Sequence, residues 1–358
     1  MGYQKIKTDA KKPILPDDQF DSIFYTLCNF FNDYYFFEVS EKFLDFITNK
    51  SSIKYLIEQA KILLYKKDYD QAITLCDEIM LKEKNNYIAC ILRGNAFFFK
   101  QNIFDSEESY VKAIRCKPDR TERFDVKMLY RLGLVYVRRK TWADAKTVFL
   151  QILKESTQFG FAWRFLGLAY MRLGEYNLAE EALNEANLLD VDNPENWAYL
   201  TIFCILVSRK FQAYECLNEL NKTKFENCEL WEEIGDLFES LGDYQIAADV
   251  YNKIIKIDPK FINVYIKLSK LYFNQFDSKR KESIEILRDC LKFAEDEKDK
   301  KRIADSIEQI TNQVGLQDSQ FLDKSLEKNV GNMNMNTDQT DIFSDLNNNQ
   351  SNQIVDDN

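Results

Sequence analysis

Residues that could carry chemistry are few in this chain, and their spacing does not suit a catalytic or metal site. Histidine is absent, which removes imidazole bases and histidine metal ligands. Of the eight cysteines, Cys204, Cys216 and Cys228 recur every twelve residues, but no C-x-x-C pair occurs and no nearby ligands complete a tetrahedral set. We therefore predict no metal site and no cofactor, and we expect reduced, buried thiols of a cytosolic protein.

Motifs that hold phosphate or calcium are also missing. No G-x-x-x-x-G-K, G-x-G-x-x-G or H-E-x-x-H pattern is present. The stretch DVDNPEN (190–196) partly matches a calcium loop, but Pro194 and the missing Gly and Glu break the pattern. We interpret this stretch as a turn, and we predict that the protein is not an enzyme.

The charge of the chain limits its partners. The formal net charge is −10, with a pI near 4.9, which argues against general affinity for nucleic acid. This charge is uneven, because residues 317–358 hold eight acidic residues and two lysines. The sequence contains no leader resembling a signal peptide and no run of eighteen apolar residues, so we expect no membrane insertion.

Several residue types return along the chain at a fixed interval of 34 residues. Trp163, Trp197 and Trp231 are each one step apart, and Tyr265 stands on the next step. Two further series have the same step: Tyr136, Tyr170, Cys204, Phe238 and Tyr272, and Ala145, Ala179, Ala213 and Ala247. Coincident series with this period are typical of tetratricopeptide repeats (TPR), whose unit is a helical hairpin. We expect all three tryptophans to pack between helices.

The residue types within one period fit such a hairpin. Gly167, in the first helix, and Ala179, in the second, are small enough to let the two helices approach to roughly 8–10 Å. Gly174 and Gly242 stand where a hairpin must turn, and glycine readily takes the positive φ that ends a helix. We predict an all-α TPR solenoid that winds as a right-handed superhelix.

The repeat register divides the chain into five regions. Seven repeats occupy residues 53–297, with a small insertion at 121–125. The other regions are a flexible N-terminal arm (1–20), a degenerate leading helical hairpin (21–52), a polar capping helix (298–316) and an acidic, Asn-rich tail (317–358). A solenoid needs a polar cap at its open end, and a tail with nine Asn and few apolar residues is expected to be disordered.

The first helices of TPR hairpins line an inner groove, and the register assigns its residues. We predict a basic part from repeats three and four: Lys127, Arg131, Arg138, Arg164 and Arg172. We predict an apolar part from repeats four and five: Phe161, Leu168, Met171, Ile202 and Ile205. We predict an acidic part from repeat six: Glu229, Glu232, Asp236 and Glu239.

The flanking sequence has the same polarity. Residues 112–146 hold eleven Lys or Arg against four acids, and residues 214–251 hold ten acids against two lysines. Such a charge dipole suits an extended ligand whose charges run in the opposite sense, and we interpret the basic part as a dock for an acidic segment. The alternative is an uneven surface charge that serves only solubility.

Two other kinds of ligand fit less well. One TPR subclass binds acidic chaperone C-termini through a carboxylate clamp, and Lys127 and Arg131 match one part of it. Ile57, Lys61 and Leu92 occupy positions where that clamp requires Lys, Asn and Asn, so the clamp is incomplete. RNA binding is disfavoured because residues 112–146 lack interleaved exposed aromatics for stacking.

Repeats four and five contain more than the general TPR pattern. The run EEALNEANLLD (180–190), followed by NPENWAYL (193–200), resembles the C-terminal TPR region of the cilia- and flagella-associated protein 70 family. The end of the array, Val314-Gly315 followed by Phe321, is similar in kind to that family's ending. The non-TPR N-terminal part of the family is missing, which leaves open a shorter paralogue or a different ciliary TPR protein.

The resemblance implies an axonemal component of motile cilia or flagella that helps position or regulate dynein-driven beating. The family carries no catalytic residues to transfer. The implied partners are axonemal or dynein-associated proteins, and the implied location is the cytoplasm, the cytoskeleton and the ciliary axoneme. Charge alone makes tubulin tails a further candidate for the basic face. The alternative is a soluble TPR adaptor, either a co-chaperone or a subunit of an intraflagellar-transport-type complex.

Overall fold

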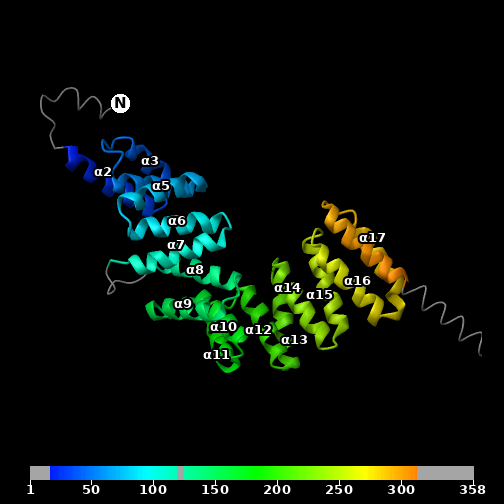
Figure 1. The fold of residues 1–358 in the computed structure, drawn as a ribbon. Coiled ribbons are helices and arrows are strands. Elements are labelled where there is room, and N and C mark those ends of the chain that lie inside the picture. Colours follow the sequence, from blue (N-terminus) through cyan, green and yellow to red (C-terminus); the bar gives the residue numbers. More distant parts are fainter. Residues whose placement is uncertain (1–16, 119–124, 313–358) are drawn as a thin grey trace, which may run out of the picture. The chain divides into compact units, whose positions relative to one another are not determined.

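Helices paired into hairpins make up the structure. The computed structural model describes residues 17–118 and 125–312, and within these ranges every regular element is a helix. The two helices of each hairpin lie side by side, as Figure 1 shows for α6 and α7. The predicted all-α class is confirmed. None of the helices in these ranges is both long and apolar enough to cross a membrane.

The helices have similar lengths throughout the array. The first helices of the hairpins are α4 (Ile53–Tyr65), α6 (Tyr87–Phe99), α8 (Val126–Arg138), α10 (Gly160–Leu173), α12 (Pro194–Leu206), α14 (Cys228–Ser240) and α16 (Ile262–Gln275). The second helices are α5 (Tyr69–Lys82), α7 (Ile103–Cys116), α9 (Trp142–Glu155), α11 (Tyr176–Leu189), α13 (Lys210–Lys222), α15 (Tyr244–Ile257) and α17 (Arg280–Cys290). They are preceded by α2 (Asp17–Asp33) and α3 (Phe37–Leu44), η1 (Asp277–Lys279) leads into α17, and residues 297–312 are helical.

Polar residues mark where most first helices begin. Each accepts a hydrogen bond on its side chain from a backbone N–H in the first turn, at Ser52, Asn86, Asp125, Asn193 and Asn227. Such a bond satisfies one of the four N–H groups that a helix start leaves without an intrahelical acceptor. Residues 190–193 form a turn that ends in the cap of α12, as interpreted from the sequence, whereas residues 194–196 already belong to that helix.

Every turn between the two helices of a repeat, up to the sixth, contains one residue in the left-handed region. Gly174 and Gly242 have φ values of 77° and 80°, which confirms their predicted role. The other repeats use a residue with a side chain at the same place: Lys67, Gln101, Lys140 and Ser208, all with φ near 60°. The backbone of the hairpin fixes this conformation even where no glycine is present, at a cost of roughly 1–2 kcal/mol per residue.

Close packing inside the hairpins depends on glycine in the first helix. A Cβ atom added at Gly235 would lie 2.5 Å from the ring of Tyr251, and one added at Gly133 would lie 2.6 Å from the ring of Phe149. The aromatic ring of the second helix therefore occupies the space that a larger residue would need. This contact sets the position of the Tyr251 side chain, whose hydroxyl takes part in a charged network described below.

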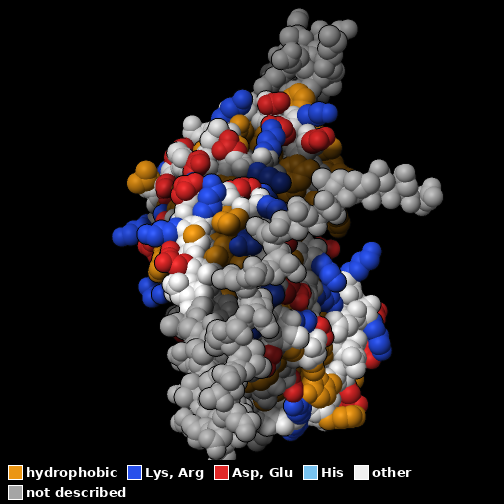
Figure 2. Space-filling view, turned by 90° about the vertical axis from the view of Figure 1, so that its right-hand side faces the viewer, with side chains coloured by type: hydrophobic (Ala, Val, Ile, Leu, Met, Phe, Trp, Pro, Cys, Tyr) orange, Lys and Arg blue, Asp and Glu red, His pale blue; other side chains and the backbone are white. Residues whose placement is uncertain are grey.

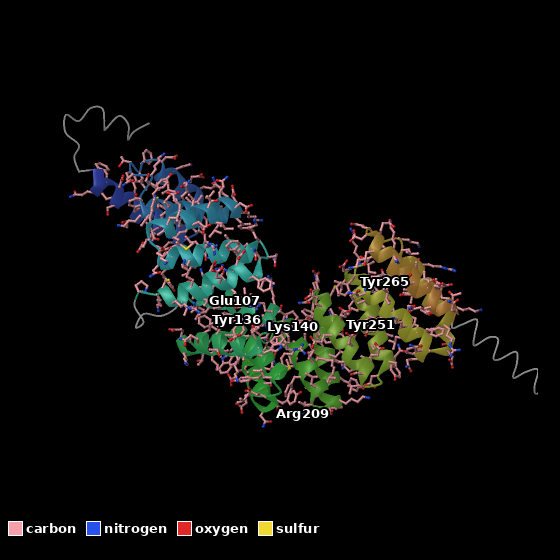
Figure 3. The ribbon with its side chains drawn as sticks, viewed as in Figure 1. Glu107, Tyr136, Lys140, Arg209, Tyr251 and Tyr265 are labelled. Carbon is pink, nitrogen blue, oxygen red and sulfur yellow. The ribbon has the colours of Figure 1, made fainter. Side chains whose placement is uncertain are left out.

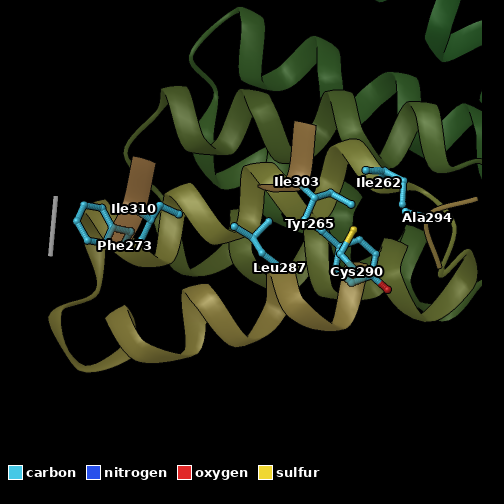
Figure 4. Close-up of a cluster of buried hydrophobic side chains, with 8 residues drawn as sticks. All are labelled: Ile262, Tyr265, Phe273, Leu287, Cys290, Ala294, Ile303 and Ile310. Carbon is cyan, nitrogen blue, oxygen red and sulfur yellow. The ribbon is translucent and has the colours of Figure 1, made fainter. Parts of the chain in front are cut away.

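The chain divides into two compact units, with the boundary between Phe225 and Glu226. In the first unit, one core cluster lies between α4, α5 and α6 and includes Leu56, Ile79 and Leu92. In the second unit, α16, α17 and the helix at 297–312 share a core cluster, drawn in Figure 4, that contains Leu287, Ile303 and others.

The N-terminal hairpin is rich in aromatic contacts. The rings of Phe24 and Phe46 stack with centroids 5.5 Å apart, and Phe31 stacks on Phe43 at 5.4 Å. Residues 17–20, which the sequence analysis placed in the flexible arm, belong to α2, where Phe20 stacks on Phe24. The rest of that arm and the predicted disordered tail at 317–358 lie outside the described residues.

The three tryptophans of the repeat register differ in burial. Trp231 is fully buried, as predicted. Trp163 and Trp197 are only partly buried, and each donates its indole N–H to a backbone carbonyl six residues earlier. The expectation that all three pack between helices therefore holds in full only for Trp231, because each of the other two borders an open cleft beside the preceding second helix.

Candidate functional site

Three basic side chains lie along one side of α8. Lys127, Arg131 and Arg138 are separated by four and seven residues, a spacing that places side chains on the same face of a helix. Their hydrogen bonds run toward the N-terminal end of the array, to α6, to the turn that follows it and to the turn between α2 and α3. The structure therefore brings together the three repeat-three residues of the predicted basic groove.

Neutral and aromatic groups hold the two arginines in place. Arg131 donates to Asn95 Oδ1 at 3.0 Å, and its guanidinium lies 5.3 Å from the centroid of the Phe99 ring. Arg138 donates to Gln101 Oε1 at 2.6 Å and lies 5.2 Å from the Phe98 ring centroid. Stacking on an aromatic ring orients a guanidinium while leaving its charge available to an anion.

Lys127 is held by a residue far away in the sequence. Its ammonium group hydrogen-bonds the hydroxyl of Tyr35 and lies 5.1 Å from the centroid of the same ring. Tyr35 is 64% exposed and has a φ of 65°, which turns the chain between α2 and α3. We call the set Tyr35, Asn95, Phe98, Phe99, Gln101, Lys127, Arg131 and Arg138 the basic aromatic face.

The described part of the chain does not neutralise the positive charge of this face. Among the described residues, none of its three cations forms an ion pair with a carboxylate. Elsewhere opposite charges are interspersed, as the side of the molecule in Figure 2 shows, and other cations of the first unit are paired, such as Lys66 with Glu41. The face therefore has three cations in fixed positions that a ligand's carboxylates could bind.

The sequence analysis missed the aromatic and amide members of this face. Phe99 could have been found, because it occupies the position in repeat two that Arg138 occupies in repeat three. Tyr35 gave no such signal, since it lies before the repeats. Exposed rings at Tyr35 and Phe99 also stand beside the basic residues, although residues 112–146 do not supply them. Aromatic groups for base stacking are therefore present at this face, and their lack is no longer an argument against RNA binding.

Arg164 does not present its charge to a ligand, which corrects the prediction. Its side chain is 9% exposed and pairs with Glu195, with 2.9 Å between Nη2 and Oε2. It also donates to Asn196 Oδ1 at 3.3 Å. Asn196 in turn donates to the carbonyls of Ala186 and Asp190, so Arg164 helps join α10 to the turn before α12. Arg172 is exposed, with its guanidinium 5.9 Å from the Trp142 ring centroid.

The predicted apolar part of the groove is almost entirely buried. Four of its five residues are no more than 4% exposed: Leu168, Met171, Ile202 and Ile205. Only Phe161 is partly exposed, and its ring meets Tyr130 at 4.6 Å. The prediction of an apolar ligand surface is therefore wrong here, because both helices are largely interior, with eight residues of α10 and nine of α12 buried. The register assigns positions but does not distinguish groove from core.

The predicted acidic part belongs to the second unit, where most of it forms a network. Lys267 Nζ lies 2.7 Å from Glu232 and 2.6 Å from Asp236. The Tyr251 hydroxyl lies 2.7 Å from Asp236 and 2.9 Å from Glu239. Burial and the hydrogen bond to Asp236 raise the pKa of Tyr251, whose position on α15 is shown in Figure 3.

The charge of Lys267 is stabilised within this network. Burial alone lowers the pKa of Lys267, but its hydrogen bonds to Asp236 and Glu232 outweigh that effect, and the pKa is raised overall. A positive charge held between carboxylates reduces the field that they present to solvent. The fourth predicted residue, Glu229, is exposed.

A separate cleft of about 860 Å³ lies in the first unit between α11, α12 and α13. Trp197, Phe203 and Cys204 from α12 line it, together with polar residues of the two second helices. Arg209, labelled in Figure 3, forms a bidentate pair with Glu180 at its edge. A smaller cleft of about 390 Å³ occurs one repeat earlier beside Trp163. The described residues contain no group of three or more His, Cys, Asp or Glu side chains placed to hold a metal.

Comparison with known proteins identifies the family. The family model described as the cilia and flagella-associated protein 70 C-terminal domain matches residues 50–305. The chain belongs to this family. The resemblance noted from repeats four and five is thereby confirmed and extends over the repeat array. Within the basic aromatic face, only Tyr35 lies outside the matched region.

Individual relatives agree with this assignment. Cilia- and flagella-associated protein 70 of Homo sapiens is 31% identical over 191 residues, and that of Macaca fascicularis is 35% identical over 145 residues. These matches cover 53% and 40% of this chain but only 17% and 14% of the relatives, so the chain spans less than a fifth of their length.

A solved structure confirms the fold. The crystal structure of a tetratricopeptide repeat protein from Parabacteroides merdae matches with a TM-score of 0.56 at 16% identity. The match covers 74% of this chain and all of the other. The predicted TPR fold is thus confirmed, and TPR arrays act through protein–protein contacts on the extended surfaces of their helices.

Proposed function

We propose that this chain is a non-enzymatic scaffold associated with motile cilia or flagella, and that its basic aromatic face docks an extended acidic segment of another protein. Family membership supports the ciliary assignment, because the relatives are cilia- and flagella-associated proteins. The observation that carries the docking site is the set of three cations on α8 that neutral partners hold in place.

The geometry of the face suits an extended acidic peptide. The cations follow α8 from its first turn to its last residue, so a ligand must be long enough to meet both ends. The arginines present planar guanidinium groups, which bind carboxylates in a bidentate manner. Rings at Tyr35 and Phe99 are 64% and 43% exposed and offer contact area for apolar side chains between the acids.

We assign the partner to the axoneme, among dynein-associated proteins or acidic tubulin tails, where the scaffold would help position or regulate the machinery that drives beating. The family and charge complementarity support this assignment. A soluble adaptor that leaves with the cytoplasmic fraction is the alternative outcome of the test.

The first test uses axonemes from ciliated cells that express the tagged full chain. Membranes are removed with detergent and the axonemes are washed in rising salt. We expect the chain to stay bound at moderate salt. Reversing Lys127, Arg131 and Arg138 to Glu should lower retention by about tenfold or more, since three exposed or half-exposed ion pairs contribute up to about 1 kcal/mol each.

A matched control separates this effect from net charge. Reversing three exposed lysines elsewhere in the first unit, Lys50, Lys84 and Lys224, changes the charge by the same amount and should leave retention near that of the wild type. Equal loss in both variants would refute the docking face. Release of the wild-type chain with the detergent-soluble fraction would instead support the soluble adaptor, and loss of binding after ribonuclease treatment would show that the anion is RNA.

A further inference from the structure

Two cysteines face each other in the cleft between α11, α12 and α13. Cys204 comes from α12 and Cys216 from α13, the two helices of one hairpin, and both line the open volume of about 860 Å³. Cys204 is 6% exposed and Cys216 is partly exposed. Their sulfhydryl groups are hydrogen-bonded to each other. A small molecule that enters this cleft therefore meets two adjacent thiols.

The geometry of packed helices allows the two residues to come within reach of a covalent bond. A disulfide requires Cα atoms roughly 4.4–6.8 Å apart. Packed helices have axes about 8–10 Å apart, and Cα atoms lie about 2.3 Å from each axis, so facing Cα atoms come within this range. Both side chains line the same cleft and are near enough for a hydrogen bond between them.

The surroundings favour a thiolate at Cys204. The hydrogen bond from Cys216 lowers the pKa of Cys204, and the nearby Arg209 guanidinium lowers it further, against the opposing effect of burial. The same hydrogen bond, together with burial, raises the pKa of Cys216. Glu180 and Glu215 are the acidic groups near Cys204, and Glu180 is paired with Arg209. Thiolates are the reactive form of cysteine.

The buried thiols outside this cleft are in less reactive surroundings. Burial raises the pKa of Cys28 to about 11 and that of Cys76 and Cys290 to about 12. A second contacting pair, Cys90 with Cys116, exists in the first unit, but burial raises the pKa of Cys90. The Cys90–Cys116 pair therefore serves as an internal standard against which the reactivity of the Cys204–Cys216 pair can be compared.

We propose that Cys204 and Cys216 form a reversible disulfide when the chain meets a hydroperoxide, making the cleft a site of oxidative modification. In the first step, the Cys204 thiolate attacks one peroxide oxygen and the O–O bond breaks. Cys204 becomes a sulfenic acid, and with hydrogen peroxide the departing hydroxide takes a proton and leaves as water. In the second step, Cys216 loses its proton and attacks the Cys204 sulfur, and the S–S bond forms as a second water leaves.

Atoms and electrons balance over the two steps, and the first step makes the second one easier. Two thiols lose two electrons and two protons, and one hydrogen peroxide is reduced to two waters. Once Cys204 has reacted, its negative charge no longer opposes ionisation of Cys216, so the second step becomes easier. The product links α12 to α13 within the cleft and does not involve the basic aromatic face.

The test oxidises the reduced full-length chain with equimolar hydrogen peroxide near neutral pH, followed by alkylation and digestion with trypsin without reductant. Arg209 and Lys210 lie between the two cysteines, so a disulfide joins two separate peptides that mass spectrometry can detect. We expect this linked pair to form faster than the Cys90–Cys116 pair, because the pKa is lowered at Cys204 and raised at Cys90. Dithiothreitol should reverse it.

Single variants identify the attacking residue. Cys216→Ser should leave a sulfenic acid at Cys204 that dimedone traps, whereas Cys204→Ser should leave Cys216 unmodified. Cys116→Ser, the matched control, should leave the linked pair unchanged, and Arg209→Gln should slow its formation. Circular dichroism verifies the fold of each variant. The proposal is overturned if both thiols stay free at equimolar peroxide, if the Cys90–Cys116 pair forms first, or if the wild-type chain yields only intermolecular crosslinks.

Discussion

The helices α8 and α14 are both first helices of a repeat, and both carry a row of like charges. On α8, Lys127, Arg131 and Arg138 have only neutral partners among the described residues. On α14, Glu232 and Asp236 share Lys267, and Asp236 also accepts from Tyr251. A ligand therefore meets exposed positive charge on α8. Much of the negative charge on α14 is already bound by Lys267 and Tyr251 of the same unit.

This difference separates the charge of a sequence segment from the charge that its fold presents. Residues 214–251 carry a larger net charge than residues 112–146, yet the network on α14 is partly neutralised by residues outside that segment, such as Lys267. We therefore expect the basic side to determine binding and the acidic side to contribute to the stability of the second unit. The following predictions test that division.

The largest effect on stability is expected from the buried tryptophan of α14. Trp231 is fully buried on α14, so Trp231→Ala should lower the free energy of unfolding of the second unit by about 3–5 kcal/mol. Trp197→Ala, at the equivalent position in the first unit, should have a clearly smaller effect because this side chain borders an open cleft. Urea denaturation followed by circular dichroism measures both. Equal losses would show that Trp197 is as much a core residue as Trp231.

The second prediction concerns Arg164, which the sequence register assigned to the basic groove but which the structure places in the interior. Arg164→Glu should lower the free energy of unfolding by about 2–4 kcal/mol, because it removes a nearly buried partner of Glu195 and places a like charge beside it. Arg138→Glu should change stability by less than about 0.5 kcal/mol, because Arg138 is exposed and makes no ion pair among the described residues.

These two variants distinguish a structural arginine from a binding one. Thermal denaturation gives the order of stability, and binding of an acidic peptide at low salt gives the order of affinity. Arg138→Glu should be the variant that loses affinity while remaining folded. If Arg164→Glu were as stable as the wild type, Arg164 would not be the link between α10 and the turn before α12.

The sequence was sufficient to predict the fold because its signal is periodic. The 34-residue interval fixes which positions pack, and the positive φ at Gly174 and Gly242 follows from the same register. The sequence did not indicate that Lys67 or Ser208 would take this conformation, since only glycine adopts it at low cost. In these repeats the packing of the hairpin outweighs the preference of the residue.

The candidate site was predictable only in part. The register correctly grouped Lys127, Arg131 and Arg138 on one helix, since spacing along a helix is a local property. It could not show that Arg164 is paired with Glu195, or that Ile202 is buried, because both depend on contacts between repeats. Tyr35 was missed for the same reason, as it meets Lys127 from a position 92 residues away.

The smallest effect is expected from the tyrosine of the acidic network, and it depends on pH. The pKa of Tyr251 is raised above its ordinary value of 10.0, so the folded chain keeps this proton at a pH where the unfolded chain loses it. Its contribution to stability is therefore present below about pH 10 and is lost as the pH rises further, by at most about 1.4 kcal/mol per pH unit. Tyr251→Phe should cost about 1–2 kcal/mol at neutral pH and should make the alkaline decline shallower than in the wild type.

Tyr244→Phe on the same helix is the matched control, and urea denaturation between pH 8 and pH 11 measures all three proteins. Because each variant replaces one tyrosine only, the contributions of the other tyrosines and of the lysines to the pH dependence cancel in the comparison. An unchanged alkaline slope in Tyr251→Phe would mean that the carboxylates of α14 do not depend on this hydroxyl, and the neutralisation of α14 would then rest on Lys267 alone.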